Sequence, residues 1–159
     1  MNTFKEIKEG VWDCADAWIV AFPEDTAKGI ISAMEDFIEE LNEVTAESRI
    51  KCLYSAAVFS NVTALVASSA SDLRRMLSLI KDSNGDLDVN SLRELIYSAR
   101  IRLQLAGRAV FDHESVLKQT SPYKEIFDCL SAVLVLLTKL VMLHDTHGWV
   151  TSSAVYSEN

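Results

Sequence analysis

The stretch YKEIFDCLSAVLVLLTKLVMLH, residues 123–144, decides the fold of this chain. Its apolar side chains occupy nearly the whole circumference of a helix, and such a helix is buried in a protein core or spans a membrane. The most apolar run, 129–143, is shorter than the ~20 residues that a bilayer span requires, and it contains Lys139. Ser121-Pro122 is typical of an N-cap followed by a first-turn proline. We therefore predict that a helix beginning at Tyr123 forms the centre of a helical bundle.

The sequence before this stretch also predicts helices. Apolar residues recur at spacings of three and four, whereas no segment alternates apolar and polar residues as a half-buried strand does. The chain has only 5 Gly and 2 Pro, and Pro23 ends the first helix. Further helices are expected at 4–22, 24–44, 47–59, 62–67, 72–81 and 89–107, with a less regular segment at 108–120. The predicted fold class is all-α.

The expected breaks come from a few local signals. Asn84-Gly85-Asp86 predicts a turn, because glycine adopts a positive φ at little cost. The serine-rich segment 68–71 is the expected linker between two halves of the chain. A capping-box pattern at 91–94 indicates that the next helix begins near it. In the helix at 47–59, the apolar residues Ile50, Leu53, Ala57 and Val58 are expected to face the core.

Charge is unevenly distributed along the chain. The formal net charge is −8, from 15 basic and 23 acidic side chains, but 12 of the acidic residues and only 3 of the basic ones fall within residues 1–48. Residues 49–108 instead contain 9 basic and 5 acidic side chains. Unlike charged ends can attract copies of the chain to one another. The alternative is an acidic helix surface that serves only solubility.

Two helix faces are the candidate interaction surfaces. The acidic face of the helix at 24–44 consists of Glu35, Asp36, Glu39, Glu40 and Glu43. The basic face of the helix at 89–107 places Arg93, Tyr97, Arg100, Gln104 and Arg108 at helical spacing. Such a basic face can meet phosphates, acidic headgroups or the acidic helix of a neighbouring copy, or it can simply be a solvated surface with local ion pairs. A general nucleic-acid binder would show a clearer basic excess.

No segment carries a specific metal or catalytic motif. Residues 82–90 resemble a calcium loop, but Leu87 replaces the glycine required at its sixth position and Arg93 replaces the bidentate carboxylate required at its twelfth. We interpret this segment as a helix-capping turn. No nucleophile and base pair, phosphate-binding glycine loop or pair of carboxylates is indicated. We expect no catalytic site, no cofactor and no enzyme activity.

The histidines and cysteines admit simpler interpretations. His144 and His147 could share a zinc ion, but no motif supplies the further ligands, so no metal site is predicted. An imidazole gains charge near neutral pH, so this pair is a candidate pH sensor. Cys14, Cys52 and Cys129 are far apart in the sequence and are expected to be buried thiols of a reducing compartment. The amino-terminal residues begin a charged helix, and no signal peptide is expected.

The order of several short motifs resembles the N-terminal domain of orthomyxovirus matrix proteins. These motifs are Arg74-Arg75, Asn84-Gly85-Asp86, Tyr97 with Arg100 and Arg102, Lys124-Glu125-Ile126, and Gly148-Trp149-Val150-Thr151. The resemblance covers about half of the chain, from Arg74 to Thr151. It implies two small helical bundles joined by a linker helix, with domains at 1–70, 71–88 (the linker helix and turn) and 89–159. It also adds Arg102 to the basic face.

The chain departs from this family in its basic tract, which is reduced to Arg100 and Arg102. We therefore expect RNA binding to be weak. The family's last domain helix would barely begin before Asn159, so the chain is expected to be a truncated piece of such a domain. These differences indicate a divergent, thogotovirus-like member.

The function predicted from these observations is that of a viral matrix structural protein. The resemblance implies a domain that self-associates into a layer under the envelope, with acid-triggered release as a further expectation. The partners that the resemblance implies are other copies of the same chain, the viral ribonucleoprotein and the inner leaflet of the viral or plasma membrane. It also implies location in the virion and in the host cytoplasm and nucleus. The alternatives are a cellular helical adaptor, which requires an exposed apolar groove, and a small enzyme or ligand-binding bundle, which requires an internal polar pocket.

Overall fold

The computed structural model describes residues 3–17, 23–83 and 87–147, and within these ranges it is all-helical. The described helices are α1 (Phe4–Ala17), α2 (Pro23–Lys51), α3 (Leu53–Asp82), α4 (Val89–Asp112), α5 (Glu114–Thr120) and α6 (Tyr123–His147). The described part of the chain contains no strand. The predicted all-α fold class is thus confirmed. The predicted turn at 84–86 lies outside the described residues.

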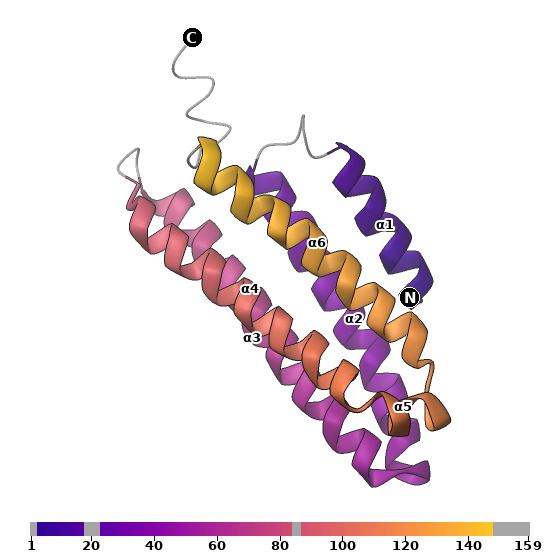
Figure 1. Ribbon diagram of the computed structural model, residues 1–159. Helices are drawn as coiled ribbons and strands as arrows, with labels where there is room; N and C mark the ends of the chain where they lie inside the picture. The colour runs from indigo at the N-terminus through magenta and orange to yellow at the C-terminus, as the bar shows by residue number, and fades with distance from the viewer. Residues whose placement is uncertain (1–2, 18–22, 84–86, 148–159) are drawn as a thin grey trace.

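Four long helices form a closed ring of neighbours. Helix α3 packs between α2 and α4, and α6 packs against both α2 and α4 (Figure 1). This order places α2 and α4 at diagonal corners of the bundle. Helix α1 covers α6 and α2 from outside, and the short α5 lies at the end of the bundle where α2 meets α3.

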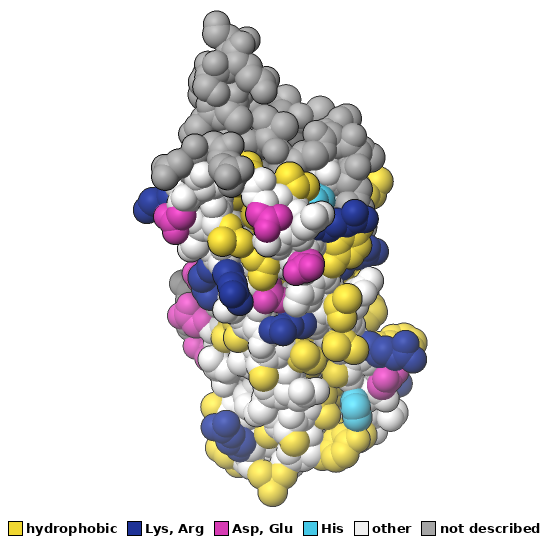
Figure 2. All heavy atoms as spheres, turned by 90° about the vertical axis from the view of Figure 1, so that its left-hand side faces the viewer, with side chains coloured by type: hydrophobic (Ala, Val, Ile, Leu, Met, Phe, Trp, Pro, Cys, Tyr) yellow, Lys and Arg dark blue, Asp and Glu magenta, His cyan; other side chains and the backbone are white. Residues whose placement is uncertain are grey.

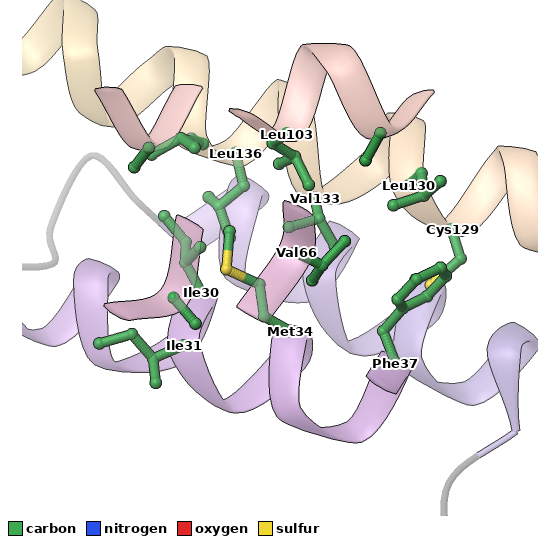
Figure 3. Close-up of a cluster of buried hydrophobic side chains, with 14 of the residues drawn as sticks. Ile30, Ile31, Met34, Phe37, Val66, Leu103, Cys129, Leu130, Val133 and Leu136 are labelled. Atoms are coloured by element: carbon green, nitrogen blue, oxygen red, sulfur yellow. The ribbon is translucent and has the colours of Figure 1, made fainter. Parts of the chain in front are cut away.

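Helix α6 is the central core helix that its sequence predicted. Apolar side chains from α2, α3 and α4 converge on it, as Figure 3 shows for Met34, Val66, Leu103 and Val133. By length and composition alone, α3 and the 123–144 part of α6 are apolar enough to cross a membrane. Half of the most apolar stretch of α6 is nevertheless buried inside the bundle. Burial against neighbouring helices accounts for its apolar sequence.

The expected linker at 68–71 is wrong, because α3 runs without a break from Leu53 to Asp82. Ser69 is fully buried and its hydroxyl donates a hydrogen bond of 2.7 Å to the carbonyl oxygen of Ala99 in α4. Ala70 beside it is also fully buried. Small side chains at 69 and 70 therefore let α3 and α4 approach closely, so they serve packing rather than flexibility.

The boundary between α2 and α3 also differs from the prediction. Helix α2 continues to Lys51, and one extended residue, Cys52, separates it from α3. Ile50 and Leu53 were expected to face the core, but both are exposed, whereas Ser48 and Ser55 are buried. The expected helix at 47–59 is therefore split at this corner. Its predicted inward side is wrong at Ile50, Leu53 and Ala57, which are exposed, and correct at Val58, which is buried.

Two predicted helix caps act differently from expectation. The carboxylate of Asp88, rather than Ser91, caps α4 by accepting hydrogen bonds from the backbone N–H groups of Asn90 and Ser91. Ser121 lies before α6, but its hydroxyl donates to the carbonyl oxygen of Leu117 and so closes α5. Both serines lie at helix boundaries, as predicted, but neither hydroxyl accepts a bond from the helix that follows it.

The buried side chains on both sides of residue 70 belong to one core cluster. Because α3 is continuous, the linker helix expected near 72–81 is the second half of a core helix that packs along both α2 and α4. The described residues therefore do not confirm the two-bundle, influenza-matrix-like arrangement.

Candidate interaction surfaces

The predicted acidic face is present on α2. Glu35, Glu39 and Glu43 are exposed, and Asp36 and Glu40 are half-buried. Partial burial raises the pKa of the Glu40 carboxyl, and the carboxylates of Glu43, Glu39 and Glu6 raise it further. Mutual repulsion thus acts on closely spaced negative charges along α2.

Glu6 of α1 belongs to this acidic surface, and the sequence analysis did not find it. Its charge contributes to the raised pKa of Glu40 on the neighbouring helix. No local sequence pattern connects residues 6 and 40, because their proximity arises only when α1 packs against α2. The surface therefore spans two helices.

Arg74 of the same molecule meets the acidic face at Glu35. The guanidinium of Arg74 in α3 forms an ion pair with the carboxylate of Glu35, and both side chains are about half exposed. An exposed pair of this kind contributes little to stability, on the order of 0–1 kcal/mol. No ion pair within the described residues involves Glu39, Glu40 or Glu43. The other linker arginine, Arg75, is exposed.

The predicted basic residues of α4 lie on two sides of that helix. The guanidinium of Arg93 lies 5.4 Å from the ring centroid of Tyr97, within the range of a cation–π contact. Arg108 lines the space between α4 and α6. Arg102 instead faces α3, where its Nε lies 3.5 Å from the carboxylate of Asp72. The expectation of one face that includes Arg102 is therefore wrong.

Carboxylates of the same chain compensate part of this basic charge. Asp72 accepts a hydrogen bond of 2.8 Å from Ser98 in addition to its ion pair with Arg102. Arg108 pairs with Asp112 one helical turn later, at 3.7 Å. The Nε atom of Arg100 is buried and has no hydrogen-bond partner among the described residues. The spacing of Arg108 and Asp112 was visible in the sequence, whereas Asp72 lies on another helix.

An apolar groove lies between α4 and α6, and the sequence analysis did not predict it. Its volume is about 440 Å³. Apolar side chains from both helices line it: Leu103, Phe111, Phe127, Leu130 and Leu134. Gly107 helps to leave it open, since even a Cβ atom added there would meet nothing within 4 Å. A glycine inside an otherwise helical pattern was the available signal.

The titratable and thiol groups are placed as follows. His144 is buried in α6, but the side chain of His147 lies outside the described residues, so the predicted histidine pair has no described geometry. Cys129 is buried, and burial raises the pKa of its thiol to about 12. Cys14 is exposed and Cys52 is half-buried, so the expectation of buried thiols is correct for Cys129 alone.

No cluster of three histidine, cysteine, aspartate or glutamate side chains that could hold a metal occurs within the described ranges. Asp88, which belongs to the calcium-like segment, is engaged in capping α4. The Ser91 hydroxyl and two backbone N–H groups lower the pKa of its carboxyl. Asp88 therefore acts as a helix cap, as interpreted from the sequence of this segment.

Comparison with protein-family models, with curated proteins and with solved structures found no match. The resemblance to orthomyxovirus matrix proteins thus rests on the sequence motifs alone. Of these, 84–86 and 148–151 lie outside the described residues. The others lie on α3 (Arg74-Arg75), α4 (Tyr97, Arg100 and Arg102) and the start of α6 (124–126).

Proposed function

We propose that this chain is a non-enzymatic structural domain whose copies associate through unlike charged faces, as in a viral matrix layer. The observation that carries the proposal is the acidic surface of α2 and α1, where partial burial and the neighbouring carboxylates together raise the pKa of Glu40. From within the chain, Arg74 of α3 forms an exposed ion pair with Glu35 of this surface. Such a surface attracts a cationic partner over several ångströms of solvent.

The position of the two charged helices supports association between copies. Helices α2 and α4 occupy diagonal corners of the bundle, so the acidic surface and Arg93 and Arg108 of α4 face different directions. When the acidic surface of one copy contacts the basic surface of the next, the pair still has one free acidic surface and one free basic surface. Contacts of this kind extend into open arrays unless the rotation closes a ring.

The viral assignment within this proposal rests on the motif order from Arg74 to Thr151. In the orthomyxovirus matrix family the motif order accompanies a two-bundle arrangement, which here would have domains at 1–70, 71–88 and 89–159, whereas the buried side chains of this chain form one core cluster. The viral assignment also carries a location beneath the envelope and at the inner face of the plasma membrane, and contact with the viral ribonucleoprotein. Weak RNA binding and acid-triggered release through His144 and His147 complete the proposal.

The test is sedimentation velocity of the chain at several salt concentrations. We expect oligomers at low salt that dissociate as salt is raised, because screening weakens attraction between exposed charges. The double variant Glu39→Lys/Glu43→Lys should remain monomeric. A matched control, Asp82→Lys/Glu125→Lys, makes the same charge change at two exposed sites away from the acidic surface and should still associate.

A charge-swapped pair sharpens the test. Arg108→Glu alone should also weaken association, and mixing it with Glu39→Lys/Glu43→Lys should restore complexes between the two variants. A wild-type chain that stays monomeric at all salt concentrations would contradict the proposal, as would a control pair that loses association equally.

A second candidate function, a helical adaptor, is favoured by the groove between α4 and α6. A groove of about 440 Å³ with apolar walls and with Arg108 and Gln104 at its edge fits the apolar side of an amphipathic helix. Gly107→Leu would place an aliphatic side chain in the groove, and its Cβ would meet no atom within 4 Å. Loss of a helical partner in this variant, with salt-dependent self-association unchanged, would favour the adaptor over the matrix-like role.

A further inference from the structure

The corner between α2 and α3 has an inverted distribution of polar and apolar side chains. Ile50 is 90% exposed, Leu53 is 75% exposed and Tyr54 is 54% exposed. Ser48 and Ser55, by contrast, are 1% and 0% exposed. Three large apolar side chains thus project into solvent while small polar ones occupy the interior. Isolated exposed apolar residues are ordinary on protein surfaces, but three within five residues form a patch.

The corner is structurally fixed. Cys52 is the single extended residue between the two helices, and its backbone N–H donates to the carbonyl oxygen of Ser48. The hydroxyls of Ser55 and Thr120 lie 3.1 Å apart and tie α3 to α5. The rings of Tyr54 and His113 are 5.5 Å apart. The apolar side chains are therefore held outward by a braced turn.

The patch is convex and flanked by cations. The α2–α3 corner forms one end of the bundle in Figure 1, and hydrophobic side chains gather at that end in Figure 2. Arg49 and Lys51, both exposed, alternate with Ile50 in the last turn of α2. Within residues 49–54 there is no acidic side chain, although the whole chain has a net charge of −8.

We propose that this corner, residues 49–54, inserts into the headgroup region of an anionic lipid bilayer. A protruding apolar tip offers no concave surface to a partner helix, whereas a bilayer deforms around it. The flanking guanidinium and ammonium groups would lie at the level of the lipid phosphates, while the aliphatic side chains reach the acyl boundary. Attraction between the cations Arg49 and Lys51 and the lipid phosphates favours an anionic surface, and repulsion of the acidic remainder orients the molecule with this corner toward it.

This inference assigns a surface to the membrane contact that the proposed matrix-like role includes, and it does not depend on the proposed self-association. The tip lies at the end of the bundle, whereas the proposed contact between copies uses the sides of α2 and α4. Failure of one proposal therefore leaves a distinct signature. Tip variants that lose vesicle binding should still associate in sedimentation without lipid, and Glu39→Lys/Glu43→Lys should still bind vesicles.

The experiment is flotation of the full chain with phosphatidylcholine vesicles that contain or lack phosphatidylserine. We expect the chain to float with the anionic vesicles only. Ile50→Asp and Leu53→Asp should each lower the partition constant by about tenfold or more, since each removes an inserted aliphatic side chain. Arg49→Gln and Lys51→Gln should each lower it by about fivefold, and added salt should do the same.

Matched controls distinguish insertion of the tip from nonspecific hydrophobic binding to vesicles. Ile101 and Leu105 of α4 are 54% and 50% exposed, so Ile101→Asp and Leu105→Asp make the same change at other exposed apolar sites. These controls should bind vesicles like the wild type. Equal losses in tip and control variants, absence of wild-type binding, or tip variants that bind normally would each overturn the proposal.

A probe of depth tests the geometry directly. The hydrogen bond from Ser55 lowers the pKa of the Cys52 thiol, which favours its labelling near neutral pH. An environment-sensitive fluorophore on Cys52, in a Cys14→Ser background, should shift to the blue on addition of anionic vesicles and be quenched by shallowly brominated lipids. No spectral change despite flotation would show that another surface binds the membrane and would refute the assignment.

Discussion

Replacing Leu103 by alanine should destabilise all four long helices together. Leu103 of α4 is fully buried and points into the cluster that includes Val66 of α3 and Val133 of α6 (Figure 3). If these helices share one core, a cavity at this point weakens every helix that borders it. If the chain instead consists of separate bundles at 1–70 and 89–159, the first bundle should be unaffected.

The magnitude follows from the atoms removed. The substitution deletes three buried carbons, which at about 0.8 kcal/mol each amounts to about 2.4 kcal/mol of lost transfer free energy. The cavity adds about 1–2 kcal/mol, because helices on several sides limit how far the core can collapse. We expect the free energy of unfolding to fall by about 3.5–4.5 kcal/mol. A domain of this size is typically stable by about 5–15 kcal/mol, so the variant should remain folded.

Native-state hydrogen exchange is the appropriate assay. The slowest-exchanging amides of α2, α3 and α6 should all lose protection. The loss, expressed as a free energy, should equal the decrease in the global free energy of unfolding measured with urea. Ile101→Ala, at an exposed position of the same helix, serves as the control and should change little. Full protection of the slowest α2 amides alongside faster exchange in α6 would refute the single shared core and favour two bundles.

Three further predictions concern local features. Gly107→Ala should raise the free energy of unfolding by about 0.5–1 kcal/mol, measured by urea, because the helix gains propensity and the added methyl meets open space. Asp88→Ala should lower the urea midpoint at neutral pH; since capping lowers the pKa of Asp88, the loss should vanish as pH falls through that pKa. Glu40→Gln should raise the midpoint at neutral pH; because the pKa of Glu40 is raised, its ionised form costs stability above that pKa, and the advantage should disappear in acid.

Local periodicity predicted the features of the fold that depend on one helix at a time. The all-round apolar pattern of 123–144 identified the core helix, and the spacing from Glu35 to Glu43 identified the acidic side of α2. Both follow from 3.6 residues per turn and need no knowledge of neighbours. The same reasoning failed at the α2–α3 corner, where Ser55 is buried against Thr120, 65 residues later.

The compensation of charge was also beyond local reasoning. The ion pairs of Arg74 with Glu35 and of Arg102 with Asp72 join residues on different helices. Whether an arginine is available to a partner depends on which carboxylate tertiary packing places beside it. The serine segment at 68–71 was misinterpreted for a similar reason, since small residues indicate flexibility in a loop and close approach in a helix crossing.

The geometry of the ion pairs indicates which arginine of α4 a neighbouring copy would engage. Asp72 is mostly buried and also accepts a hydrogen bond from Ser98. Removing Arg102 from it would leave a buried carboxylate without its cation, which is energetically costly. Arg108 and Asp112 are both largely exposed and 3.7 Å apart, so their pair contributes only about 0.3–0.5 kcal/mol. Exchanging Asp112 for the carboxylates of another molecule therefore costs little. A head-to-tail contact should recruit Arg108 and leave Arg102 in place.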